Sequence, residues 1–209
     1  MRTSTCGICV IFSALVTLAS VTKSLASPET LFKVQGAKLL ETGAEVDFSA
    51  LAKDDTVKAF LIANVASMCG YTESGYQDLR EIASRYDPKI VVLGAPCAQF
   101  GNQEYAQGDR ILAFAESKGA NFPLLERQDV NGDSASELFT FLKAESCKLE
   151  GADKDCGDVR WNFEFFLVDA STGKLVKRWR TGTRLLAPEV LQVLDATISS
   201  AKAERTKEL

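Results

Sequence analysis

The sequence predicts an α/β protein in which a central mixed β-sheet is covered by helices. Two continuous apolar runs, "VKAFLIANVAS" at 57–67 and "IVVLGAP" at 90–96, are typical of buried strands, and each is followed by helical spacing of apolar residues. Further along, "FEFFLVDA" and "KLVKRWR" flank the turn sequence "STG", which predicts a β-hairpin. This order of elements, without a linker, favours one domain over residues 27–209.

The other expected elements come from turn and capping signals. Thr42-Gly43 lies between two moderately apolar runs within 31–51, which predicts an N-terminal β-hairpin. The helix after the first strand carries apolar side chains at helical intervals until Asp87-Pro88 ends it. Helices are also expected at 109–119, 134–146 and 187–204, and a short strand at 122–128.

The first 26 residues differ from the rest of the chain. Arg2 precedes an apolar stretch of thirteen residues at 9–21, and Ser24 and Ala26 are small residues suited to cleavage before Ser27. The stretch is shorter than the roughly 20 residues that span a bilayer. We therefore expect residues 1–26 to be a secretory signal peptide, with a retained anchor as the alternative, and we expect no stable membrane span.

The last residues, "RTKEL", end in Glu-Leu and are similar to a KDEL-type retrieval signal. Thr206 and Lys207 stand where lysine and aspartate are usual, so a frayed polar tail is the alternative. Together with the signal segment, this ending predicts a protein of the secretory pathway, either in the lumen of the endoplasmic reticulum or secreted.

Composition excludes several kinds of site. The chain contains no histidine, which removes Ser-His and Cys-His hydrolases and every metal site with a histidine ligand. The net charge is −4 and no basic cluster stands out, so nucleic acid is not an expected partner. A zinc site with four cysteine ligands would need paired short spacings that the chain lacks. We expect no metal and no cofactor.

Six cysteines are present, and two of them lie within the signal segment. Cys147 and Cys156 bracket a polar stretch of eight residues, and a bond between them would close a small loop. Such a bond is worth roughly 2 to 3 kcal/mol. We expect a structural disulfide here, with a redox relay for Cys69 as the alternative.

Cys69 is predicted to lie where the first buried strand ends and a helix begins. The first backbone N–H groups of a helix have no partner within the helix, and they favour a thiolate over a thiol. The sequence therefore suggests a reactive sulfur, although a small buried hydrophobe is what most free cysteines are.

Three segments resemble the signature blocks of the glutathione peroxidase family, and they occur in the family's order. They are "NVASMCGYT" (64–72), "APCAQFGNQE" (95–104) and "WNFEFFLVD" (161–169), and the agreement includes "DVNG" at 129–132. The resemblance covers roughly residues 31–198 and implies a thioredoxin-like fold. It also implies a thiol peroxidase that reduces hydrogen peroxide or organic and lipid hydroperoxides.

The resemblance assigns roles to individual residues. Cys69 matches the peroxidatic position, which forms a sulfenic acid and is then regenerated by a thiol. Gln103, Trp161 and Asn162 match the family's other active-site positions, and their amide and indole N–H groups can donate without titrating. Cys97 matches the candidate resolving cysteine of the family's endoplasmic-reticulum branch, with an inert buried thiol as the alternative.

The reductant is left open among glutathione, thioredoxin and protein disulfide isomerase. Ala115 stands where relatives regenerated by thioredoxin carry a resolving cysteine. Phe165 replaces a frequent lysine, which weakens the case for anionic glutathione and favours a protein partner or a lipid hydroperoxide. A monomer is expected. The alternative function is a thioredoxin-fold disulfide oxidoreductase or redox sensor, but "CGYT" supplies only one of the two sulfurs of a CxxC motif.

Overall fold

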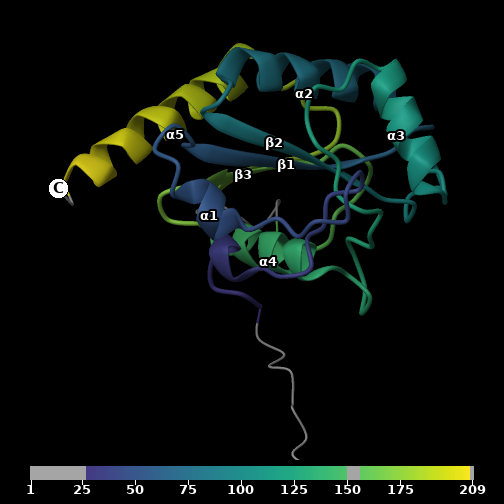
Figure 1. Cartoon of the computed structure of the whole chain (residues 1–209), viewed down its shortest axis with the longest axis horizontal. Coiled ribbons are helices and arrows are strands. Elements are labelled where there is room, and N and C mark those ends of the chain that lie inside the picture. Colours follow the sequence, from purple (N-terminus) through teal and green to yellow (C-terminus); the bar gives the residue numbers. More distant parts are fainter. Residues whose placement is uncertain (1–26, 150–155, 208–209) are drawn as a thin grey trace, which may run out of the picture.

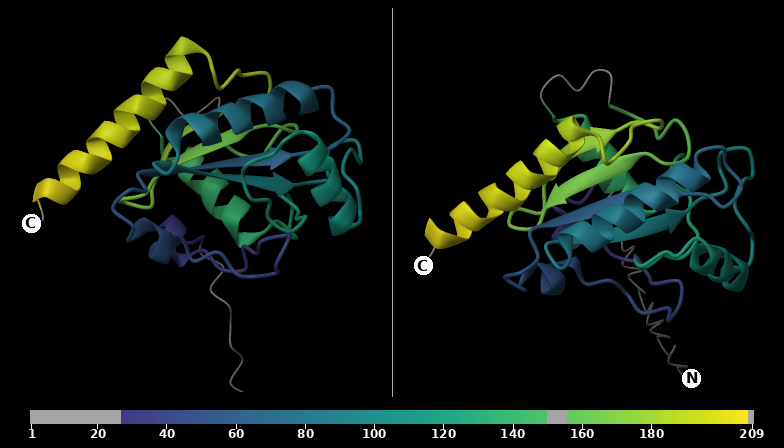
Figure 2. Two further views of the ribbon diagram at one scale, coloured as in Figure 1. Left: turned by 45° about the horizontal axis from the view of Figure 1, so that its top comes forward. Right: turned by 90° about the horizontal axis from the view of Figure 1, so that it is seen from above.

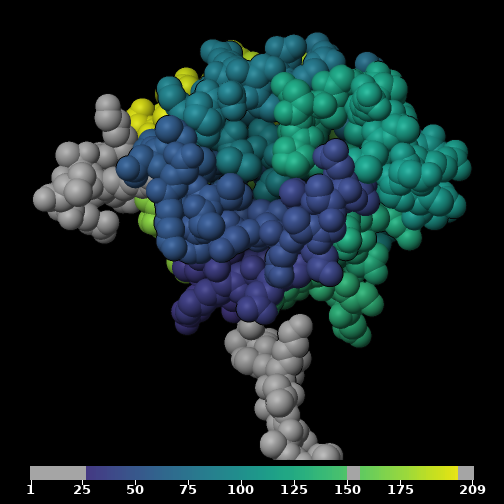
Figure 3. Space-filling view, viewed as in Figure 1, coloured from purple at the N-terminus to yellow at the C-terminus, as the bar shows by residue number. Residues whose placement is uncertain are grey.

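The structure is a computed structural model that describes residues 27–149 and 156–207 (Figure 1). The expected signal peptide and the terminal Glu-Leu lie outside the described residues. Within the described ranges, no helix is both long and apolar enough to cross a membrane. The segment 27–56, drawn in purple and blue, is spread over the face of the molecule below α2 (Thr72–Tyr86) in Figure 3.

Four strands form one mixed sheet in the order β2-β1-β3-β4. They are β1 (Ala59–Val65), β2 (Ile90–Pro96), β3 (Phe165–Asp169) and β4 (Leu175–Trp179). β2 runs parallel to β1, whereas β3 runs antiparallel to both β1 and β4. All seven residues of β1 are buried, which agrees with its nearly unbroken apolar sequence. The predicted mixed sheet and its C-terminal hairpin are confirmed.

Helices cover both faces of the sheet (Figures 1 and 2). The other helical elements are η1 (Leu31–Lys33), α1 (Phe48–Ala52), α3 (Gly108–Ser117), α4 (Glu137–Ser146) and α5 (Pro188–Lys207). Phe60 and Ile62 of β1 pack in one core cluster with α1 and α4. Leu61 and Ala63 pack in a second cluster with α2, α3 and α5. The alternation of side chains along a strand thus divides the core into two clusters, one on each face of the sheet.

Two predicted strand regions are shorter than the sequence suggested. The N-terminal hairpin is reduced to a single antiparallel bridge between Lys38 and Glu45. The chain then turns helical at α1, because the Asp47 side chain accepts a hydrogen bond from the Ala50 N–H at 2.8 Å and so caps that helix. In the predicted strand 122–128, Leu124 and Leu125 each form only an isolated bridge.

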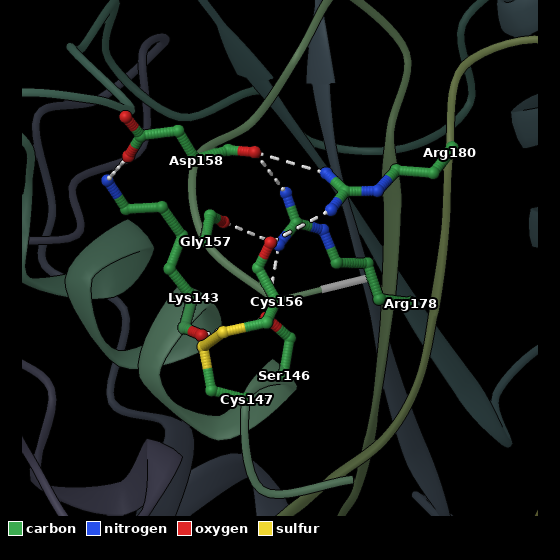
Figure 4. The surroundings of a disulfide bond; sticks show 8 residues. All are labelled: Lys143, Ser146, Cys147, Cys156, Gly157, Asp158, Arg178 and Arg180. Carbon is green, nitrogen blue, oxygen red and sulfur yellow. Dashed lines mark hydrogen bonds and ion pairs between the residues drawn. A yellow bond between two sulfur atoms is a disulfide. The ribbon is translucent and has the colours of Figure 1, made fainter. Parts of the chain in front are cut away.

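The disulfide between Cys147 and Cys156 is present. It joins the end of α4 to the segment that leads towards β3, and β4 binds the same region (Figure 4). The guanidinium of Arg178, which is buried, donates to Ser146 Oγ at 3.0 Å and to the Gly157 carbonyl at 2.8 Å. Arg180 donates to the Cys156 carbonyl at 3.2 Å. Arg178 and Arg180 therefore bind the chain at both ends of the loop that the disulfide closes, and these contacts do not depend on the disulfide itself.

Replacing both Cys147 and Cys156 by serine is therefore expected to cost only the loop-closure term, about 2 to 3 kcal/mol of the free energy of unfolding. The contacts of Arg178 and Arg180 remain, so peroxide consumption should be retained. Urea denaturation of the double variant and of the oxidised wild type measures the first quantity. Loss of peroxide consumption would instead support the relay alternative.

Candidate active site

Cys69 lies in the turn between β1 and α2, as the sequence predicted, and its exposed fraction is 9%. Thr72, the first residue of α2, organises this turn. Its hydroxyl donates to the Ala66 carbonyl at 2.7 Å and accepts from the Cys69 N–H at 3.0 Å. The Tyr71 N–H donates to Cys69 Sγ at 3.5 Å, so a main-chain donor of the helix start faces the sulfur.

The structure brings Gln103 and Asn162 together. Asn162 is fully buried, and its Nδ2 donates to Gln103 Oε1 at 3.0 Å. This bond occupies the acceptor oxygen of Gln103 and leaves its NH₂ group as a donor. The main-chain carbonyl of Gln103 accepts from the Met68 N–H at 2.9 Å, which ties the pair to the residue before Cys69. Asn162 Oδ1 is buried and has no hydrogen-bond partner among the described residues.

Trp161 lies at the surface, with 38% of its area exposed, and its ring centroid is 5.8 Å from that of Phe100. The four predicted site residues therefore come from three segments, which follow β1, follow β2 and precede β3. Because β1 and β2 are parallel and β3 is antiparallel to β1, these segments meet at one edge of the sheet.

Phe163 and Gly75 were not identified from the sequence, yet they shape this edge. Phe163 has a φ of 63°, in the left-handed region that non-glycine residues seldom adopt. Its buried ring lies against α2 at Gly75, where an added Cβ would be 2.2 Å from Phe163 Cδ1. Only glycine lets the first turn of α2 approach the segment that carries Asn162 so closely.

Glu104 is a third residue that sequence reasoning missed. Its side chain is buried, and its Oε1 accepts from Ser67 Oγ at 2.5 Å and from the Tyr105 N–H at 2.8 Å. Its Oε2 is buried without a hydrogen-bond partner in the described ranges. Burial raises the pKa of this carboxyl above its usual value of 4.5, although the hydrogen bond from Ser67 opposes the shift. Glu104 thus joins the Gln103 segment to the turn before Cys69.

The raised pKa of Glu104 predicts a pH-dependent stability. The folded protein holds this proton more tightly than the unfolded chain, so the free energy of unfolding should fall as pH rises from about 4.5 through the raised pKa. Glu104→Gln keeps an acceptor oxygen for Ser67 and removes the titration. Urea denaturation between pH 4 and pH 8 should show a decline in the wild type that the variant lacks, and parallel curves would contradict the prediction.

Cys97, the candidate resolving residue, is fully buried just after β2. It packs in the cluster on the α1 and α4 face, whereas Cys69 packs in the cluster on the α2 face. Burial raises the pKa of the Cys97 thiol, and the Gln99 N–H at 3.5 Å from its sulfur opposes the shift. The structure therefore places the two free cysteines in separate parts of the core.

Phe165 is buried, whereas from the sequence we expected it to present an apolar side chain to a partner or a lipid hydroperoxide. Its exposed fraction is 2%, and it packs in the cluster beneath α2. It cannot present an apolar surface to a partner, because both faces of β3 are covered and all five of its residues are buried.

The comparisons with known proteins agree with this geometry. The family model described as glutathione peroxidase matches residues 36–143, which is just over half of the chain. The chain belongs to the glutathione peroxidase family. The "Glutathione peroxidase-like peroxiredoxin 2" of Saccharomyces cerevisiae is 41% identical over 129 residues, which cover 61% of this chain and 76% of the yeast protein.

Two further similar proteins extend the comparison. The "Hydroperoxy fatty acid reductase gpx1" of Synechocystis is 44% identical over 134 residues, 61% of this chain and 76% of that protein. The solved structure "Crystal structure of Trgpx in apo form" is 31% identical with a TM-score of 0.58, and the match covers 84% of this chain and 97% of the other. The thioredoxin-like fold is confirmed, and the protein is a thiol peroxidase that reduces hydroperoxides.

Proposed function

We propose that Cys69 is the peroxidatic residue of this glutathione peroxidase family member. The Cys69 thiolate attacks one oxygen of a hydroperoxide, so that an S–O bond forms while the O–O bond breaks. Sulfur is oxidised to a sulfenic acid, and the second oxygen leaves as water or alcohol with the proton that the thiol gave up. The observation that carries this proposal is the Cys69 turn, which binds the Gln103–Asn162 pair through Met68.

Gln103, Asn162 and Trp161 act in this proposal as uncharged donors. The Asn162 contact uses the side-chain oxygen of Gln103, so its NH₂ group serves as the donor, and the Tyr71 N–H already faces the sulfur. Fixed neutral donors stabilise charge that develops on sulfur and on the leaving oxygen, and they need no change of protonation state. In a chain without histidine, this is a direct way to assist cleavage of the peroxide bond.

Bulky organic hydroperoxides fit the site surface, and we propose them as substrates alongside hydrogen peroxide. Four large hydrophobic side chains are exposed among the described residues, and three of them, Met68, Tyr71 and Trp161, belong to the site segments. An apolar surface of this kind would bind the hydrocarbon part of a lipid hydroperoxide. The name of the Synechocystis relative, a hydroperoxy fatty acid reductase, supports the same class of substrate.

We propose that an external thiol, from glutathione, thioredoxin or a protein disulfide isomerase, reduces the Cys69 sulfenic acid. The burial of Cys97 in the other core cluster supports this, because an internal disulfide would require both sulfurs to leave their packing. The disulfide between Cys147 and Cys156 supports a place in the oxidising secretory pathway.

Chemical trapping tests these assignments. The protein is treated with one equivalent of hydrogen peroxide or of a fatty acid hydroperoxide in the presence of dimedone, and its cysteines are mapped by mass spectrometry. We expect the dimedone adduct on Cys69, with Cys97 unmodified and the same product in a Cys97→Ala control. An adduct only on another cysteine would overturn the peroxidatic role of Cys69. A Cys69–Cys97 disulfide would overturn the external thiol alone.

A further inference from the structure

Asn64 is a polar residue inside the central strand of the sheet. It lies in β1, where every residue is buried, and its own exposed fraction is 0%. Its neighbours in the strand are apolar, in the sequence "AFLIANV". Burying an amide without hydrogen-bond partners lowers the stability of the folded protein by roughly 1 to 3 kcal/mol. The hydrogen-bond partners of Asn64 therefore indicate why an asparagine occupies this position.

Beside its place in the β1–β2 ladder, Asn64 makes three hydrogen bonds to the segment that carries Trp161 and Asn162. Asn64 Nδ2 donates to the Trp161 carbonyl at 3.0 Å, and Asn64 Oδ1 accepts from the Glu164 N–H at 2.9 Å. Its main-chain carbonyl accepts from the Phe163 N–H at 2.7 Å. One residue of β1 therefore binds the backbone on both sides of Asn162.

These bonds are needed because the segment leaves the sheet at this point. The regular pairing of β3 with β1 begins at Phe165, and the left-handed conformation of Phe163 turns the chain away just before it. The Trp161 carbonyl and the Glu164 N–H fall outside the ladder. An asparagine amide offers both a donor NH₂ group and an acceptor oxygen, whereas an ionised aspartate offers only acceptors and a leucine offers neither.

Other contacts hold this segment from different elements. Thr181 Oγ1 donates to the Asn162 carbonyl at 2.8 Å, and Glu164 accepts hydrogen bonds from Arg178 and Arg180 of the region of β4. These partners bind the segment from the side of β4. Asn64 is different because it lies on the strand that leads directly to Cys69, five residues further on.

We propose that Asn64 is a positioning residue for the peroxidase reaction. It fixes the Trp161–Asn162 segment relative to Cys69, and so it sets where the donor groups point when the hydroperoxide is attacked. This inference rests on the proposed roles of Cys69, Trp161 and Asn162. The hydrogen bonds of the Asn64 side chain go to backbone atoms, and Asn64 takes no part in bond making.

The test compares Asn64→Asp and Asn64→Leu with the wild type in a Trp179→Phe background, which leaves Trp161 as the one tryptophan of the chain. The second-order rate constant for oxidation of Cys69 is measured in a single turnover, and acrylamide quenching reports the exposure of the Trp161 indole. A displacement of about 1 Å costs roughly 10²-fold in rate. We expect about that loss in Asn64→Leu, a smaller loss in Asn64→Asp, and changed quenching in both.

The matched control is Ile62→Val, which removes one methylene group from the same buried strand. It should lower stability without changing the rate constant or the quenching. If the Asn64 variants that remain folded by circular dichroism keep the wild-type rate and quenching, the positioning role is wrong. If the wild type itself forms no adduct on Cys69 with dimedone, the proposed function fails instead, so the two failures are distinguishable.

Discussion

Cys69→Ser is expected to abolish the reduction of hydroperoxides, with a loss on the order of 10⁴-fold or more in the rate constant. A serine hydroxyl is a weak nucleophile without a base beside it, and this chain has no histidine to supply one. The neutral donors that remain cannot cleave the O–O bond without a nucleophile. Stopped-flow measurement of peroxide loss in a single turnover, with enzyme in excess, gives the rate without depending on the reductant.

The matched control for this substitution is Cys97→Ser, since Cys97 is the other free cysteine of the described chain. It should keep the single-turnover rate, because Cys97 packs in a different core cluster. A Cys69→Ser protein that still consumed peroxide at the wild-type rate would show that the reacting sulfur lies elsewhere.

Gly75→Ala should cause the largest loss of stability from the addition of a single methyl group near the site. The added Cβ would lie 2.2 Å from Phe163 Cδ1, and the Phe163 ring is buried with its backbone held by Asn64. Overpacking costs about 1 to 3 kcal/mol or more, against a gain of roughly 1 kcal/mol from the helix propensity of alanine. We expect a net loss of about 2 kcal/mol in the free energy of unfolding and a slower reaction of Cys69.

Urea denaturation and the single-turnover rate measure these two effects of Gly75→Ala. Gly70→Ala is the control for stability, because a Cβ at Gly70 would meet no atom within 4 Å. An unchanged unfolding midpoint in Gly75→Ala would show that the Phe163 ring moves aside without cost, and that the close approach of α2 does not constrain the site.

The elements that could be predicted from the sequence are those with a local signal. The apolar run of β1 and the helical spacing of apolar residues in α2 can each be recognised from the residues of that element alone. The predictions of the sheet and of its covering helices were confirmed for this reason. The prediction of a strand in the second half of the N-terminal hairpin was wrong, because the Asp47 side chain caps a helix, α1, at this position. Propensity in a short segment is a weak signal that one such contact can override.

The residues that were missed act through partners far away in the chain. Asn64 binds residues 97 and 100 positions later, and Ser67 donates to Glu104 across 37 positions. The sequence around Gly75 does not show that the Phe163 ring packs against this glycine, and only that contact explains why glycine is required there. The position of Phe165 was misinterpreted for the same reason, since its burial depends on elements elsewhere in the chain, such as α2, that cover β3.

The division of the two free cysteines between opposite faces of the sheet has a consequence for how long the oxidised enzyme persists. In the proposed reaction, the Cys69 sulfenic acid lies in a different core cluster from the Cys97 thiol, so its reduction depends on a collision with a donor from solution. During that wait, a second peroxide molecule can carry the sulfur on to sulfinic acid, which ordinary thiols do not reverse. Sustained exposure to peroxide with little thiol donor present should therefore inactivate the enzyme irreversibly. The concentration of the thiol donor would then determine how many turnovers the enzyme completes.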